Sequence, residues 1–396
     1  METELTPVIT PKPRFDYLDI FKCLAIVLMV VGHCGGSTWF VTYIYSFHMA
    51  AFFFVLGFMT DFKKGSTLSY AVKQFMRLMV PFFFISIVFL SVKALLQLIP
   101  GYVTPFGYAD VDFGTSLKLL FERGDVYSQP LGAIWFLPCL FFASIIMKLL
   151  VKACDGKRWL VIVLSSFVAI LGFYLISINY QDFLWLLRPT QVLIAQYFIC
   201  LGYLVGQSPI VRRFINKEHP FVVTGCLAFF LTISILIVAL GHFHMNMSDN
   251  YYGKPTWYMV IATLSGSMML LCLSVLLAKL PKGISIVLQH IGKASFAIMI
   301  FHFLAIKLFG LFLSGVGYFD YAAIASVVPP DGTSGILRFV YIVLAVAFGV
   351  GCYDALRHIP VVNCLVGLNP KWGNYLSKKT EEGLIKLANP GNDDAV

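Results

Sequence analysis

The most constraining feature of this 396-residue chain is a succession of apolar runs, each long enough to cross a bilayer as a helix. A spanning helix needs about 20 mostly apolar residues. Hydrophobic residues make up 59% of the chain and charged residues 12%, so the chain is more apolar than soluble domains, at about 45–50%, and carries less charge than their about 25%. We therefore expect an all-α fold, a polytopic membrane bundle of about ten transmembrane helices. The predicted spans are 18–38, 42–60, 78–99, 131–150, 159–178, 183–206, 220–241, 257–278, 294–314 and 336–355.

Basic residues alternate between the connections of these spans. The connections after the second, fourth, sixth and eighth spans carry clusters of Lys and Arg, whereas the others are poor in base. By the positive-inside rule, this alternation predicts that both termini are cytoplasmic and that the protein is a multi-pass protein of the inner or plasma membrane. We expect a cytoplasmic segment over 1–17, a transmembrane domain over 18–355 and a cytoplasmic tail over 356–396. This polar tail is expected to lie along the membrane or to be disordered.

Composition excludes several other classes. The net charge of +9 is spread over short juxtamembrane clusters rather than one patch, so no nucleic-acid partner is expected. The nine cysteines form no C-x-x-C pair, and most lie in apolar runs as small hydrophobic residues do. His242-Phe243-His244 has no third ligand in view, so no metal site is predicted. Gly202-x-x-x-Gly206 indicates a helix-packing face.

Ionisable residues inside the first two spans mark a candidate site, because charge in a bilayer is costly and usually serves function. Lys22 and His33 are eleven residues apart, so they share one stripe of the first helix and lie roughly 16 Å apart along its axis. His48 begins the second span after a short connection and can approach His33. The structural alternatives are a Lys22 that snorkels to the interface, a His33 hydrogen-bonded at its helix end and an interfacial His48.

Two later spans add polar residues to this set. Ser295 and His302 are seven residues apart, close to two turns, and share a stripe of the ninth helix. The alternative for this pair is hydrogen bonding between helices. Arg188 precedes Pro189 near the outer end of the sixth span, which suggests a polar cavity reached from outside. The alternative is an arginine that snorkels to the outer headgroups.

The order and spacing of five motifs resemble the acyltransferase-3 family of integral-membrane O-acyltransferases, and most closely the branch similar to fucose 4-O-acetylases and related glycan O-acetyltransferases. Lys22 stands where much of the family has Arg, and a lysine cannot make a planar two-pronged contact. The motifs are RFDYLDIFKCLAIVLMVVGH from Arg14 to His33, SFHMAAFFFVLGF from Ser46 to Phe58, Arg77-x-x-x-Pro81, Trp135-Phe136-Leu137 and GKASFAIMIFH from Gly292 to His302.

The resemblance implies transfer of an acyl group, usually acetyl, from cytoplasmic acyl-CoA to a hydroxyl of a cell-surface or lipid-linked glycan. No tightly bound cofactor is expected, because acetyl-CoA or another acyl-CoA serves as the donor substrate. His33 is expected to act as general base or to carry the acyl group transiently. The other expected roles are catalysis for Lys22, substrate binding for His48, Arg188, Ser295 and His302, and binding of the CoA phosphates for Lys63, Lys64 and Arg77.

Two alternatives remain open at the level of sequence. The basic cluster that contains Lys63 and Lys64 is also explained by topology signalling alone. A secondary transporter or exporter of a small polar or anionic metabolite would also have about ten helices, buried charges and a Pro-interrupted span. Against a transporter, no internal repeat is detectable, and the polar residues gather in the first, second, sixth and ninth spans. A scaffolding protein would not need a histidine inside its first span.

Overall fold

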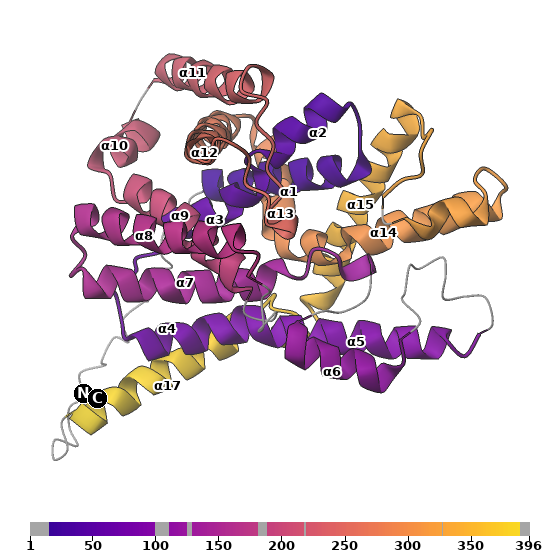
Figure 1. Cartoon of the computed structure of the whole chain (residues 1–396), viewed down its shortest axis with the longest axis horizontal. Helices are drawn as coiled ribbons and strands as arrows, with labels where there is room; N and C mark the ends of the chain where they lie inside the picture. The colour runs from indigo at the N-terminus through magenta and orange to yellow at the C-terminus, as the bar shows by residue number, and fades with distance from the viewer. Residues whose placement is uncertain are drawn as a thin grey trace, which may run out of the picture.

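The computed structural model describes residues 16–99, 111–124, 129–180, 188–217, 219–326 and 328–388 (Figure 1). The predicted all-α class is confirmed, because these residues form helices and only one isolated β-bridge, between Asn246 and Tyr251. Ten helical segments within them are long and apolar enough to span a bilayer, as predicted. They are Asp16–Cys34 (α1), Thr38–Met59 (α2 and α3), Thr67–Leu96 (α4 to α5), Phe136–Ala153 (α7), Arg158–Ser177 (α8), Pro189–Gly206 (α9), Pro220–Ala239 (α11), Trp257–Leu277 (α12), Ser295–Gly315 (α14) and Gly335–Leu356 (α15).

Shorter helices lie between and after these spans. They are α6 (Phe113–Arg123), α10 (Pro209–Lys217), α13 (Lys282–Lys293), α16 (Val362–Leu365) and α17 (Lys371–Ala388). Because successive connections of a spanning bundle alternate in side, we name two faces. The basic face carries the α3–α4, α7–α8, α9–α11 and α12–α14 connections together with α17. The base-poor face carries the α1–α2, α8–α9, α11–α12 and α14–α15 connections.

The centre of the bundle is built on close contact between α3 and α9. A Cβ atom added at Gly202 or Gly206 would overlap the backbone carbonyl oxygen of Phe54 or Phe58, and one added at Gly57 would overlap that of Ile199. Small residues let helix backbones approach within a bilayer, where hydrophobic burial between helices gives little drive. The interpretation of Gly202 and Gly206 as a packing face is therefore confirmed.

The second span is broken in the middle, which the sequence did not predict. α2 (Thr38–Tyr45) ends and α3 (His48–Met59) begins on either side of Ser46 and Phe47. The Ser46 hydroxyl donates to the Tyr43 carbonyl oxygen at 2.7 Å, so the break satisfies its own polar groups. The Phe47 ring packs against Gly266 of α12. Because the span begins at Thr38 rather than at residue 42, His48 lies near its middle rather than at its outer end.

The third span begins earlier than expected and contains a π-helical turn. α4 (Thr67–Gln74) continues through the π-helix Phe75–Met79 into α5 (Val80–Leu96). Pro81 lies in the first turn of α5, where its missing N–H breaks the regular hydrogen-bond ladder. Single π-turns inside helices frequently mark functional sites. This one contains Arg77.

The tail has a docking site that the sequence did not predict. α17 packs along α4, as Figure 1 shows at the lower left. Glu381 accepts hydrogen bonds from the backbone N–H and the hydroxyl of Ser66, and the hydroxyl groups of Ser69 and Ser377 lie 2.7 Å apart. A polar helix is therefore held against the basic face by specific contacts.

Candidate active site

A cavity of about 1010 Å³ runs through the bundle from the basic face to the base-poor face. Its lining includes Lys73 and Arg77 at one end and Met245–Ser248, from the α11–α12 connection, at the other. His33, Tyr45 and His48 line it between these ends. The cavity thus connects the two faces through the histidines of the first two spans.

Among the helices that line this path, α1, α3 and α14 each present one face to it. On α1 the lining residues are Lys22, Met29 and His33, which lie on one stripe as predicted. On α3 the lining runs from His48 through Phe52 to Met59, about 16 Å along the axis. α14 contributes Ser295, Phe296, Met299 and Phe303. The walls between the polar residues are therefore mostly apolar and suit a slender, weakly polar ligand.

The end of α1 is fixed where His33 lies. The Arg338 guanidinium, from α15, donates to the Cys34 carbonyl oxygen at 2.7 Å and to the Thr333 carbonyl oxygen at 3.0 Å. Gly35 follows with φ of +76°, a conformation that glycine adopts without steric cost. A charged donor on terminal carbonyl groups stabilises a helix end. The last turn of α1, and His33 with it, is thereby held in place.

Aromatic rings surround His33 on several sides. Its ring stacks on His302 with centroids 5.3 Å apart, and Phe303 lies 4.7 Å away. The Tyr45 hydroxyl is 3.2 Å from His33 Nδ1, and the Tyr45 ring also contacts His48 edge to face at 5.0 Å. Tyr45 therefore lies between the two cavity histidines.

The hydrogen bonds of His48 and His302 determine which ring nitrogen each presents. His48 Nδ1 is 2.9 Å from the Ile44 carbonyl oxygen, so it carries the proton and donates it. His302 Nδ1 likewise donates to the carbonyl oxygens of Ile298 and Met299. In a neutral ring, Nε2 is then the acceptor. His302 is fully buried, and its Nε2 has no hydrogen-bond partner among the described residues.

The basic end of the cavity is an anion-attracting surface. Lys22, Lys73, Arg77 and Lys293 line it, and no Asp or Glu of the described chain lines the cavity. Lys22 also pairs with the buried Asp19, with Nζ 2.6 Å from Oδ1. Several cations without acids among the lining residues raise the local concentration of anions.

The base-poor end is lined by a folded turn rather than by charged side chains. The segment Met245–Tyr252 turns through the short 3₁₀ helix Met247–Asp249, and Asn246 pairs with Tyr251. Gln191 of α9 donates through Nε2 to the carbonyl oxygens of Met247 and Ser248, both at 3.2 Å. The lining at this end consists of neutral side chains, backbone and the indole of Trp135.

The predicted site residues divide into those that line the cavity and those that do not. Lining the cavity are Lys22, His33, His48, Arg77 and Ser295.

His302 lies directly behind His33 rather than in the lining. Arg188 packs its guanidinium over the Trp135 ring, 5.5 Å from the centroid, and so supports the wall from outside.

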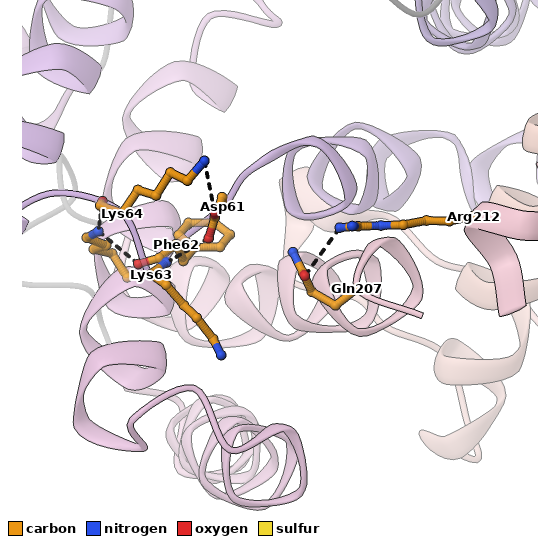
Figure 2. A network of polar contacts seen from close by, with 7 residues as sticks. Asp61, Phe62, Lys63, Lys64, Gln207 and Arg212 are labelled. Atoms are coloured by element: carbon orange, nitrogen blue, oxygen red, sulfur yellow. Dashed lines mark hydrogen bonds and ion pairs between the residues drawn. The ribbon is translucent and has the colours of Figure 1, made fainter. Parts of the chain in front are cut away.

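Lys63 and Lys64 lie on the basic face outside the cavity lining. Lys64 is largely exposed and pairs with Asp61 at 3.6 Å, and Figure 2 shows Lys63 extending away from that pair. The peptide carbonyl groups of this loop instead bind Lys148, whose ammonium donates to those of Phe62, Lys64 and Gly65. Arg212, also in Figure 2, is bonded to Gln207 on the same face. The described cations that line the cavity are Lys22, Lys73, Arg77 and Lys293.

The sequence did not single out Tyr45 or the tail residues in the cavity lining. Tyr45 is one of 19 tyrosines, and only the break in its span brings it to His33. Gly32 supplies the space, because a Cβ atom there would lie 3.0 Å from the Tyr45 ring. The one local signal in the sequence is Gly32, directly before the intramembrane His33, because a glycine there indicates that another residue packs closely against this turn.

The geometry agrees with a comparison of the sequence with protein families. The sequence model of the acyltransferase-3 family, described as an acyltransferase domain, matches residues 15–356. The chain belongs to this family. No curated protein and no solved structure matches it. This membrane acyltransferase therefore has the family's domain over all ten spans, whereas α16 and α17 lie beyond the matched residues.

Proposed function

We propose that this acyltransferase moves an acetyl or other short acyl group from acyl-CoA to a hydroxyl group of a cell-surface or lipid-linked glycan. The observation that carries the proposal is the cavity itself, which joins a basic end, with no acidic residue among its described lining, to a neutral end through His33. Acyl-CoA is a polyanion with a thin, weakly polar arm, and it matches the basic end and the apolar walls. A glycan is a neutral polyol, and it matches the other end.

The distribution of charge supports the sidedness in this proposal. The connections of the basic face are richer in lysine and arginine than those of the base-poor face, which supports a cytoplasmic position for the basic face. Acyl-CoA would enter past Lys73 and Arg77, and its thioester would reach His33 along the faces of α1 and α3. The acceptor would approach past the Met245–Tyr252 turn. Lys22, paired with Asp19, would attract the donor phosphates as a point charge.

The chemical step is an acyl transfer with His33 as general base. The acceptor oxygen attacks the thioester carbonyl carbon while His33 Nε2 takes the hydroxyl proton. The C–S bond then breaks, and the imidazolium returns that proton to the departing thiolate, which leaves as CoA thiol. This route requires Nδ1–H of His33 to donate to the Tyr45 oxygen, 3.2 Å away, so that Nε2 is bare. His48, with its own Nε2 as acceptor, would orient the acceptor hydroxyl.

The proposal is tested with purified protein, labelled acetyl-CoA and a surface-glycan extract. We expect label in the glycan with the native chain and a loss of about 10²–10⁴-fold in kcat/KM with His33→Ala. His358→Ala is the matched control, because His358 is exposed at the end of α15 and outside the cavity lining. Full transfer by an inserted His33→Ala protein would contradict the role of His33. Accumulation of an unmodified solute in vesicles, without acylation, would support the transporter instead.

A further inference from the structure

The segment that follows the last span forms one wall of the cavity at its basic end. This segment lies outside the residues that match the acyltransferase domain. The segment therefore adds lining residues to the cavity that lie beyond the matched domain. The lining residues in it are Cys364, Gly367, Leu368, Asn369, Pro370, Trp372, Gly373 and Asn374.

Two glycines hold this wall against the π-helical turn that carries Arg77. A Cβ atom at Gly367 would lie 3.0 Å from the Arg77 carbonyl oxygen and 2.8 Å from Pro81 Cγ, and Gly367 has φ of +73°. A Cβ atom at Gly373 would lie 3.3 Å from the carbonyl oxygen of Lys73. The chain thus crosses the backbone of the two cations at close range, and any larger side chain would lift it away.

Contacts farther along α17 keep this crossing in place. Ser377 is bonded to Ser69, and Glu381 accepts from the N–H and hydroxyl groups that Ser66 presents at the start of α4. The hydrogen bonds from Ser66 stabilise the ionised carboxylate of Glu381 and so lower its pKa. The first turn of α17 is therefore positioned from both sides, by Gly367 before it and by these bonds after it.

Trp372 is the large aromatic residue of this wall. Its side chain lines the cavity and keeps 43% of its surface exposed. Within the described residues, no other ring and no cation packs on its indole. An indole face beside Lys73 and Arg77 combines the two elements of nucleotide recognition, a stacking platform and cations for phosphate.

We propose that Trp372 and the Gly367–Asn374 segment form a subsite for the nucleotide part of the acyl donor. The indole stacks on the purine ring, while Lys73 and Arg77 hold the phosphates. The subsite rests on the proposed function, because that function supplies a donor with a nucleotide. This subsite gives the tail a role in selecting the donor. The apolar part of the cavity does not have this role, because it contacts only the arm of the donor that carries the acyl group.

The test compares two donors, acetyl-CoA and acetyl-pantetheine, which has the same thioester arm without the nucleotide. With Trp372→Ala we expect the KM for acetyl-CoA to rise about 5-fold to 100-fold, and the KM for acetyl-pantetheine to stay unchanged. Trp372→Phe should keep most of the affinity, because a phenyl ring still stacks. Trp159→Ala, at an exposed tryptophan of α8 outside the cavity lining, should change neither value. An equal rise for both donors, as expected of a membrane anchor, would overturn the subsite.

Direct binding separates the subsite from the transfer reaction. The probe is 3′-phosphoadenosine 5′-diphosphate, titrated into the purified full chain and its Trp372→Ala variant. Binding that depends on Trp372 in a protein that acylates no glycan would leave the subsite standing and overturn the proposed function. Glycan acylation with unchanged nucleotide binding in Trp372→Ala would leave the function standing and overturn the subsite. Absence of nucleotide binding by the native chain would overturn the subsite as well.

Discussion

The two ends of the cavity differ in how they are built. At the basic end, Lys73, Arg77 and Lys293 gather without any acidic lining residue in the described chain, an arrangement that attracts anions. At the base-poor end, the Met245–Tyr252 turn is held by Gln191 through backbone carbonyl groups, and the described lining is neutral. The contrast suits the proposed pair of unlike substrates, because the described lining residues at the neutral end include no lysine or arginine.

Among changes at the two ends, we expect the largest effect on a substrate KM from a substitution at Arg77. Arg77→Ala should raise the KM for acyl-CoA about 10-fold or more and leave the KM for the acceptor unchanged, because a hydrogen bond to a charged group is lost at the donor end alone. Steady-state kinetics with each substrate varied in turn measures both values. Lys64→Ala is the matched control, since Lys64 is a cation of the same face outside the cavity lining. An equal loss in Lys64→Ala would show that the donor binds on the outer surface instead.

The corresponding substitution at the base-poor end is Gln191→Ala. Gln191→Ala leaves the carbonyl groups of Met247 and Ser248 without their donor, so the turn loses its anchor. We expect the acceptor KM to rise about 3-fold to 10-fold with the donor KM unchanged, measured in the same assay. Gln196→Ala is the control, because Gln196 is also buried and α9-borne but bonds to Ser165. A change in donor affinity alone would invert the assignment of the two ends.

A smaller effect is expected at Tyr45, where the two ends meet. Tyr45→Phe removes the hydroxyl that sets the His33 ring, so kcat should fall about 2-fold to 10-fold while both KM values stay the same. Tyr43→Phe removes a hydroxyl from the same helix that contacts Ser234 instead, and it should have no such effect on kcat. Equal kcat values for the two variants would remove Tyr45 from the chemical step.

The smallest effect concerns the clasp between α17 and α4. Hydrogen bonds from Ser66 hold the pKa of Glu381 below its usual range, so the ionised form stabilises docking. Since the folded-state pKa is depressed, this contribution is complete above about pH 4.3, the ordinary carboxyl range, and is lost as pH falls through the depressed value. The hydrogen-exchange protection factors of α17, corrected for the intrinsic exchange rate at each pH, should fall at such low pH, and in Glu381→Gln already at neutral pH. Glu382→Gln, which loses only a pairing within α17 to Lys378, should exchange as the native chain does.

Much of this architecture could be predicted from the sequence because the bilayer imposes simple rules. The count of ten spans follows from apolar length. The placement of Lys22 and His33 on one lining stripe follows from helical geometry, and both do line the cavity. These features depend on one helix at a time.

Features that depend on several helices could not be predicted in the same way. The break at Ser46 and Phe47 needs Gly266 on α12 to receive the Phe47 ring, and that pairing is invisible along the chain. The break brings Tyr45 to His33. Charge clusters were equally ambiguous, because Lys63 and Lys64 fit the positive-inside rule as well as a role in ligand binding. Only the fold shows that Lys73 and Arg77 line the cavity and that Lys63 and Lys64 do not.

The central claim is that donor and acceptor reach His33 from opposite faces, and it is tested most directly in proteoliposomes with the protein inserted in one orientation. Acyl-CoA is supplied on one side of the membrane and the glycan acceptor on the other, and acylated glycan is measured. Transfer is expected only when acyl-CoA is on the side of the basic face. Transfer of equal rate with acyl-CoA on the side of the base-poor face would contradict the account.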